Sequence, residues 1–246
     1  MKNHLKRVTS PKTWALPRRG RVFITRPLPS GHPIDQGMPL GLVLRDMLAL
    51  ALTMSEVRKI LLSKEVLVDG KRRKDHRFHV GLFDVISFPG LGKQYRMVLN
   101  QNGYLALIPI PAAEASLKLG KVLGKSILKS GKVQYHLHDG RNLSTKSVSK
   151  VGDTFLFTVP AQEVQKVFPL KEGAKIITYA GKNAGRVGMI RKIAGRESTY
   201  NAGGKDVETV TRHLFVVGEK EMALTVVVAE QRKASAASTP VTISNT

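Results

Sequence analysis

The 246-residue sequence contains no cysteine, which excludes disulfides, zinc fingers and thiol catalysis. Acidic residues are also scarce, with 18 Asp and Glu against 40 Lys and Arg. There is no long apolar run: the charge-free stretch 97–113 is interrupted by Asn100–Gly103, Pro109 and Pro111, so we predict no membrane helix. We also expect no secretory signal, because the polar, basic N-terminus is followed by no apolar stretch.

The net charge of +22 is the first functional signal. A surplus of this size repels itself unless a partner neutralises it, and RNA, DNA and an anionic membrane are the partners that can. We favour nucleic acid, with a merely soluble basic enzyme as the alternative. Because 42% of the residues are hydrophobic, the chain can build two or three small folded domains.

Residues 1–37 are expected to form a basic N-terminal arm. Residues 1–34 hold eight Lys and Arg, five prolines and no acid, so this segment cannot build a core of its own. We expect it to become ordered on a partner. Trp14, the only tryptophan, is predicted to stack on RNA or to pin the arm to the body, and simple packing on the next domain is the alternative.

Residues 38–93 predict two helices and a hairpin. Pro39 suits the first turn of a helix, whose expected buried stripe is Leu40, Val43, Leu44, Met47, Leu48 and Ala51. Thr53-x-x-Glu56 is a capping box that starts a second helix, and Asp69-Gly70 is a strong hairpin turn. The residues outside the apolar faces are basic, which suits phosphate contacts; a solvated surface is the alternative.

From residue 94 onward, short apolar runs separated by turns predict a β-rich chain. Asn100–Gly103 is expected to connect a hairpin, and a new unit begins near Glu172-Gly173. Residues 112–117 predict one or two helical turns, and the Ala-, Ser- and Thr-rich tail from 231 is expected to be disordered. The expected strands are 84–88, 95–99, 104–110, 153–159, 175–179, 186–192, 207–212, 214–217 and 223–228.

Three patterns that resemble catalytic or metal sites carry little weight. Gly120-x-x-x-Gly124-Lys125-Ser126 has one residue too few between its glycines for a phosphate loop, so the lysines between 121 and 132 are interpreted as RNA-facing or solvated charge. His76-x-x-His79 lacks a third ligand, and His136-x-His138-Asp139 is typical of a structural pair. We therefore expect no catalytic residue, no metal, no cofactor and no small-molecule substrate.

Several segments of the sequence resemble one protein family. The stretches that are similar to the RNA-binding module named after bacterial small-subunit ribosomal protein four are Leu44–Leu48, Glu56–Leu61 and Val66–Lys71. His4–Val8, Pro11–Trp14 and Val80–Ser87 narrow the resemblance to the archaeal and eukaryotic e-type family of ribosomal protein four, which is not homologous along its length to the bacterial namesake. The parts that resemble its central domain and its C-terminal KOW motif are Gly103–Pro109, Leu137–Asn142 and Gly181–Gly188. The resemblance covers residues 1–228, although Tyr179-Ala180-Gly181 stands where a Gly-richer turn is expected.

The resemblance implies an α+β, multidomain fold of archaeal type. Its expected parts are the arm at 1–37, the RNA-binding module at 38–93, a β-rich central domain at 94–170, an SH3-like β-barrel with the KOW motif at 171–230 and the tail at 231–246. It also implies a non-enzymatic, structural constituent of the cytoplasmic small ribosomal subunit. Its expected partners are 16S-type small-subunit rRNA and neighbouring small-subunit ribosomal proteins, with no membrane.

The predicted rRNA-binding residues fall in three segments. In the arm they are Lys2, His4, Lys6, Arg7, Lys12, Trp14, Arg18, Arg19 and Arg21. In the module they are Arg45, Arg58, Lys59, Lys64, Lys71, Arg72, Arg73 and Lys74, and in the KOW loop Lys182, Asn183 and Arg186. Two alternatives stay open: a KOW-containing transcription or ribosome-assembly factor, and an RNA-modifying or tRNA-charging enzyme that carries the same module beside a catalytic domain.

Overall fold

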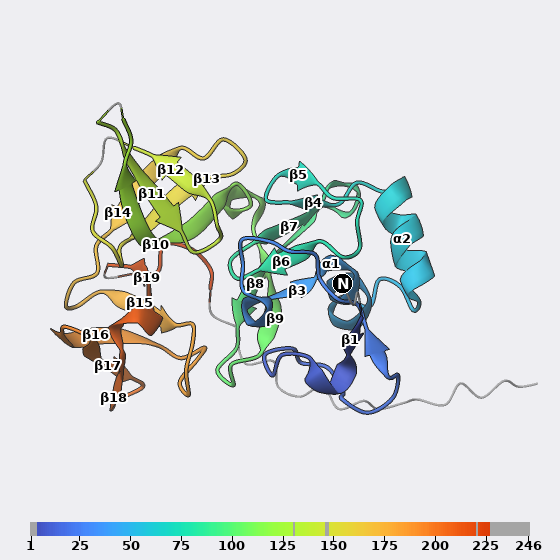
Figure 1. The fold of residues 1–246 in the computed structure, drawn as a ribbon, viewed down its shortest axis with the longest axis horizontal. Coiled ribbons are helices and arrows are strands. Elements are labelled where there is room, and N and C mark those ends of the chain that lie inside the picture. Colours follow the sequence, from blue (N-terminus) through green and yellow to red (C-terminus); the bar gives the residue numbers. More distant parts are fainter. Residues whose placement is uncertain (1–3, 130, 146–147, 220, 227–246) are drawn as a thin grey trace, which may run out of the picture.

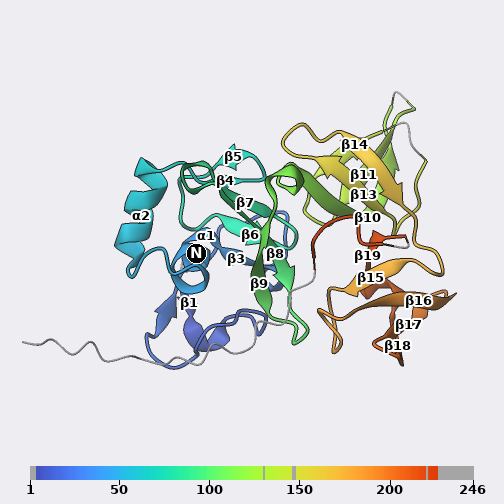
Figure 2. The ribbon, with the colours of Figure 1, turned by 180° about the vertical axis from the view of Figure 1, so that it is seen from behind.

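The computed structural model describes residues 4–129, 131–145, 148–219 and 221–226. This part of the chain is mostly β, with few helices, as the coarse α+β prediction expects. Figure 1 and its reverse view, Figure 2, show the arm and module on one side and two further sheets stacked on the other. No helix among the described residues is both long and apolar enough to span a bilayer.

The first unit is built on a five-stranded antiparallel sheet of order β5-β4-β7-β8-β9. Its strands are β4 (Leu67–Val68), β5 (Lys71–Arg72), β7 (Val85–Phe88), β8 (Lys93–Leu99) and β9 (Leu105–Ile110). The domain boundary predicted at residue 94 is therefore wrong. Strands β8 and β9 form the predicted hairpin, but β8 pairs with β7, so the sheet of the module continues to residue 110.

Two short helical segments precede this sheet. The helix α1 (Leu40–Leu42) continues as a π-helical turn over Val43–Met47, and α2 covers Met54–Ser63. The first helix was expected to reach Ala51, but Ala49 adopts a left-handed φ of 51°, which ends the helical path earlier. The capping box is confirmed, since the Glu56 amide donates to the Thr53 hydroxyl at 3.2 Å.

The arm folds back on the module. Strand β1 (Leu5–Lys6) pairs with β2 (Phe23–Ile24), and β3 (Gly37–Pro39) pairs with β6 (His79–Gly81). Trp14 and Ile24 are buried in the module's core. The arm therefore gains its order from the body of the protein, because its few apolar side chains have a core to join there.

The central sheet has the order β12-β11-β10-β13-β14. Its strands are β10 (Leu117–Ile127), β11 (Val133–Leu137), β12 (Asn142–Ser144), β13 (Thr154–Thr158) and β14 (Val164–Phe168). The Gly120–Ser126 pattern lies within the long strand β10 and forms no loop. The helical turn expected near residue 112 is a single 3-10 turn over Ala112–Glu114.

The C-terminal sheet has the order β18-β17-β16-β15-β19. Its strands are β15 (Lys175–Thr178), β16 (Val187–Ala194), β17 (Glu197–Ala202), β18 (Lys205–Val210) and β19 (Leu214–Gly218). Strand β17 was missed because its residues are mostly polar, yet Ser198 and Tyr200 alternate into the interior.

The strand expected at 223–228 is wrong for the residues described there. Residues 223–226 belong to no strand, although Leu224 and Val226 are buried. The Arg96 guanidinium donates to the Thr225 carbonyl at 2.9 Å, and the Thr225 amide donates to the Glu114 carboxylate at 3.0 Å. Side chains from β8 and from the 3-10 turn at Ala112–Glu114 thus replace a neighbouring strand as partners of this backbone. Residues 227–228 and the predicted disordered tail lie outside the described part of the chain.

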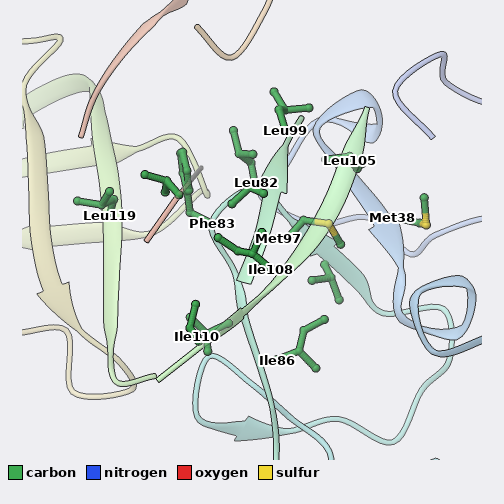
Figure 3. Packing of buried hydrophobic residues seen from close by; sticks show 14 of the residues in the cluster. Met38, Leu82, Phe83, Ile86, Met97, Leu99, Leu105, Ile108, Ile110 and Leu119 are labelled. Carbon is green, nitrogen blue, oxygen red and sulfur yellow. The ribbon is translucent and has the colours of Figure 1, made fainter. Parts of the chain in front are cut away.

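One hydrophobic core runs through all three units. Figure 3 shows the buried side chains of the β8–β9 hairpin, with Phe83 on the side that faces Leu119 of β10. The Phe83 ring also lies 4.5 Å, centroid to centroid, from Phe215 of β19. A second, smaller core sits inside the central sheet around Phe155 and Phe157. Because the larger core crosses the unit boundaries, it orients the basic surfaces relative to one another.

Candidate nucleic-acid interface

Six exposed cations of the first unit form what we call the module face. They are Arg58 and Lys59 on α2, Lys64 after it, Lys71 and Arg72 on β5, and Lys74. No ion pair involves any of them among the described residues. Figure 1 shows α2 at the outer side of the module, away from the other two sheets, and β5 along the edge of the module's sheet. Exposed cations that no salt bridge neutralises are available to phosphates.

Two contacts hold α2 against the β5 segment. The Arg72 guanidinium donates to the Leu62 carbonyl at 3.1 Å, and Arg58 Nη2 lies 3.3 Å from His76 Nε2. Burial and the Arg58 charge lower the pKa of His76, so its ring is neutral at pH 7 and accepts from the arginine. The helix and the hairpin therefore present their charges from one rigid surface.

Arg45 and Arg73 were predicted to join this face, but their charges are engaged elsewhere. Arg45 Nε and Nη2 each donate to the Asp46 carboxylate at 2.9 Å, and its side chain is mostly buried. The Arg73 guanidinium stacks 4.1 Å from the centroid of the Phe78 ring. A paired or stacked guanidinium offers less charge to a phosphate, which removes both residues from the group of free cations.

The arm divides its predicted residues into two groups. Arg7 donates to the Pro17 carbonyl at 2.7 Å, and Arg18 donates to the carbonyls of Val8, Ser10 and Pro11 at 2.8–3.0 Å. These two arginines therefore hold the arm's own loop. The exposed group consists of His4, Lys6, Lys12, Arg19 and Arg21, and Lys2 lies outside the described residues.

Trp14 corrects a prediction. Only 2% of its surface is exposed, and its Nε1 donates to the Gly37 carbonyl at 2.7 Å. No face of the ring is open to a nucleic-acid base, so the predicted stacking on RNA is wrong for this conformation. The ring pins the arm to the module, which is the other interpretation that the sequence left open.

The loop 179–186 carries the predicted KOW-like residues. Lys182 and Arg186 are exposed, and the Asn183 carbonyl accepts from the Arg186 amide at 3.2 Å. Gly185 has a φ of 84°, and a Cβ there would lie 1.7 Å from the Asn100 carbonyl oxygen. Glycine is therefore required for the loop to sit against the β8–β9 turn.

A cleft of about 1070 Å³ brings the arm and this loop together. Its walls come from residues 8–18, from the β8–β9 hairpin and from loop 179–184. Asp35 is the acidic residue among its lining residues. Lys12 and Lys182, which are 170 positions apart in the sequence, both line it. Two of the three predicted basic segments thus meet at one place, and the module face remains a separate surface.

The charged residues that the prediction missed are buried between the units. Lys118 of β10 is fully buried, and its Nζ donates to Asp69 Oδ2 at 2.8 Å, donates to Asp84, and lies 3.1 Å from Asp139 Oδ2. Arg141 pairs with Asp69 and, at 3.3 Å, with Asp139. These contacts tie the module's turns to the central sheet. In the sequence, Asp69-Gly70 gave only a turn signal, and Asp139 was considered as part of a structural His138-Asp139 pair.

Burial and neighbouring charge set the pKa values in this ionic cluster. Burial disfavours the charged form of Lys118, but the three carboxylates outweigh it and raise its pKa above the usual value. Burial also opposes ionisation of Asp84, yet Lys118 and His32 hold its pKa well below the ordinary range. His138 lies beside the cluster, and burial lowers its pKa to about 3. Lys118 and its three carboxylates are almost fully buried, whereas Arg141 is partly exposed where the cluster lines a small pocket of about 260 Å³.

Lys121 corrects another prediction, since it was interpreted as RNA-facing or solvated charge. It is buried, and its Nζ donates to the carbonyls of Arg212 and Leu214 at 2.7 and 2.6 Å. Burial, with a smaller effect from the Arg212 charge, lowers its pKa to about 8. Lys121 therefore fastens the central sheet to the C-terminal sheet.

Comparisons with known proteins place this architecture among small-subunit ribosomal proteins. Residues 91–164 match the model of "Ribosomal family S4e", and residues 1–35 match that of the "RS4NT (NUC023) domain". The small ribosomal subunit protein eS4 of Korarchaeum cryptofilum is 43% identical over 232 residues, covering 90% of this chain and 95% of the relative. That of Methanocella arvoryzae is 37% identical over 228 residues, covering 90% and 97%.

A solved structure gives the same result. The 30S ribosomal protein S4e from Thermoplasma acidophilum superposes with a TM-score of 0.65 at 34% identity, covering 75% of this chain and 96% of that one. The fold and the sequence together define a ribosomal protein of archaeal type. The chain belongs to the eS4 family of the small ribosomal subunit, as the resemblance of its motifs predicted.

Proposed function

We propose that this chain is a structural, non-catalytic constituent of the cytoplasmic small ribosomal subunit that binds small-subunit rRNA. The single observation that carries the rRNA contact is the module face, where six exposed cations form no salt bridge within the described residues. A folded protein that keeps several unpaired cations on one rigid surface gains from a polyanion that displaces counterions there. The family to which the chain belongs supports the same assignment.

The division of the charged residues supports this role. Buried cations such as Lys118 and Lys121 join the three units, whereas the exposed ones of the module face, arm and loop 179–186 are left for phosphates. We assign the C-terminal sheet to an SH3-like barrel with a KOW loop on the motif at Gly181–Gly188. A rigid body with several basic surfaces suits the recognition of RNA shape and holds neighbouring rRNA helices beside other small-subunit proteins.

The test is the salt dependence of binding to small-subunit rRNA. Replacing Arg58 and Lys59 by alanine removes two phosphate-binding charges, so the slope of log affinity against log salt is expected to fall by roughly 1–2. Arg191→Ala is the matched control, because this exposed arginine is already paired with Asp206 at 2.7 Å. An unchanged slope in the double variant would remove the module face from the rRNA interface.

Location is measured separately. After a high-salt wash, we expect the protein to sediment with mature small subunits at about one copy each. Sedimentation with precursor particles or with polymerase would instead support the assembly-factor or transcription-factor alternative.

A further inference from the structure

The small β1–β2 sheet of the arm has two unlike faces. Its register places Leu5 opposite Ile24 and Lys6 opposite Phe23. Residues directly opposite each other in an antiparallel pair point to the same face. Leu5 and Ile24 pack on the core, so Lys6 and Phe23 share the outer face.

The outer face carries an aromatic ring without a protein cover. Phe23 is 56% exposed, and it is the one exposed phenylalanine of the eight, all of which are described. The His4 ring meets it edge-on at 5.5 Å between centroids, with an interplanar angle of 75°. A single T-shaped contact covers only part of a phenyl ring, so the exposed remainder of Phe23 can meet a base. The adjacent Val22 is also exposed, at 65%.

The charge around this ring favours a nucleic acid over an apolar protein surface. Lys6 lies directly across from Phe23, and Arg19 and Arg21 are exposed close to it in the sequence. Residues 4–34 contain no Asp or Glu, so the platform has no acidic group of its own segment beside it. Sites for unpaired nucleotides combine an aromatic ring that stacks on a base with cations that follow the backbone.

We propose that Phe23, flanked by His4 and Lys6, is a stacking platform for an unpaired RNA base. The base lies on the phenyl ring, and the phosphates on either side meet Lys6 and Arg21. This inference rests on the proposed rRNA-binding function and adds its ligand class, a single-stranded nucleotide. From the sequence, Trp14 was a candidate to stack on RNA. In the fold Trp14 is buried and Phe23 is exposed, so Phe23 is the ring that can stack on a base.

The experiment uses the full chain with a 12-nucleotide single-stranded RNA that contains one 5-iodouridine, and with a duplex of the same length. Iodouridine crosslinks under light to an aromatic ring that stacks on it, and mass spectrometry locates the crosslink. Phe23→Leu keeps an apolar side chain but removes the ring, and is expected to weaken single-strand binding about 5- to 100-fold. Phe23→Tyr retains a ring and is expected to bind and crosslink as the unaltered chain does. Ile127→Ala on β10, which removes another exposed apolar side chain, is the matched control.

A crosslink at Phe23 that is lost in Phe23→Leu and kept in Phe23→Tyr and Ile127→Ala supports the proposal. It is overturned if Phe23→Leu binds the single strand normally, or if the crosslinks map elsewhere. A variant that binds RNA normally but fails to join small subunits would show a protein-docking surface instead, which also overturns it. Duplex binding by Arg58→Ala/Lys59→Ala tests the module face independently, so failure of the platform is distinguishable from failure of rRNA binding.

Discussion

Replacement of Lys118 by methionine is the sharpest test of how the three units are joined. The variant keeps the length of the side chain but removes the cation that faces Asp69, Asp84 and Asp139. At about 3 Å and an effective dielectric constant near 20, each close carboxylate contributes roughly 5 kcal/mol of attraction. Burial of the four charged groups offsets most of this sum, and the net loss on removing one partner of such a cluster is about 3–5 kcal/mol.

The assay is urea unfolding followed by the fluorescence of Trp14, which is the only tryptophan and is buried against the module. Lys118→Met is expected to lower the free energy of unfolding by about 3–5 kcal/mol at pH 7. Lys125→Met on the same strand is the matched control, because Lys125 is exposed and its loss is expected to cost less than about 0.5 kcal/mol.

The pH dependence of this deficit is a second readout. Without Lys118, burial and mutual repulsion raise the pKa values of the carboxylates above their unfolded values, so protonation stabilises the folded variant. The deficit relative to the unaltered protein is therefore expected to shrink as the pH falls from 7 towards 5. A Lys118→Met protein that is as stable as the Lys125→Met control at pH 7 would refute the argument that this cluster holds the units together.

Two further predictions concern His138 and Gly185. The pKa of His138 is lowered to about 3 in the folded state, so below about pH 6.5 the unfolded chain binds the extra proton and stability falls as the pH drops towards 3. His138→Gln does not titrate, and its urea midpoint is expected to fall less steeply between pH 7 and 5; an equal slope would contradict this. Gly185→Ala places a Cβ 1.7 Å from the Asn100 carbonyl oxygen. In the same urea assay, it is expected to lower the free energy of unfolding by more than about 2 kcal/mol. Gly195→Ala, at a φ of 62° with open space around it, is expected to lose only the roughly 1–2 kcal/mol of backbone strain, and equal losses would rule out the contact.

Local patterns predicted part of the fold. The capping box placed the start of α2, and the Asp69-Gly70 turn and the Asn100–Gly103 turn each connect the expected hairpin. These features depend on neighbours in the sequence, so a single chain is sufficient to find them. The first helix was placed correctly at its start, but its end depended on the left-handed residue Ala49, for which composition gives no signal.

The candidate interface was predicted only in part, because composition does not say which cations are paired. Arg58 and Lys59 remain exposed on the module face, whereas Arg45 pairs with Asp46 and Arg18 binds carbonyls of its own loop. The strongest disagreement is Lys121, which was expected at the surface and is buried between two sheets. Whether a lysine faces solvent or a distant carbonyl depends on contacts between segments about 90 residues apart.

Motifs and total composition were enough to identify the family, the excess of positive charge, the predicted hairpins and the helix cap, because each depends only on neighbouring residues or on residue counts. Tertiary structure decided which charges are free. It extended the module's sheet to residue 110, buried Lys118 among three aspartates and exchanged Trp14 for Phe23 as the exposed ring. The physical reason is that burial and pairing are set by long-range packing, which brings together side chains that no local pattern relates.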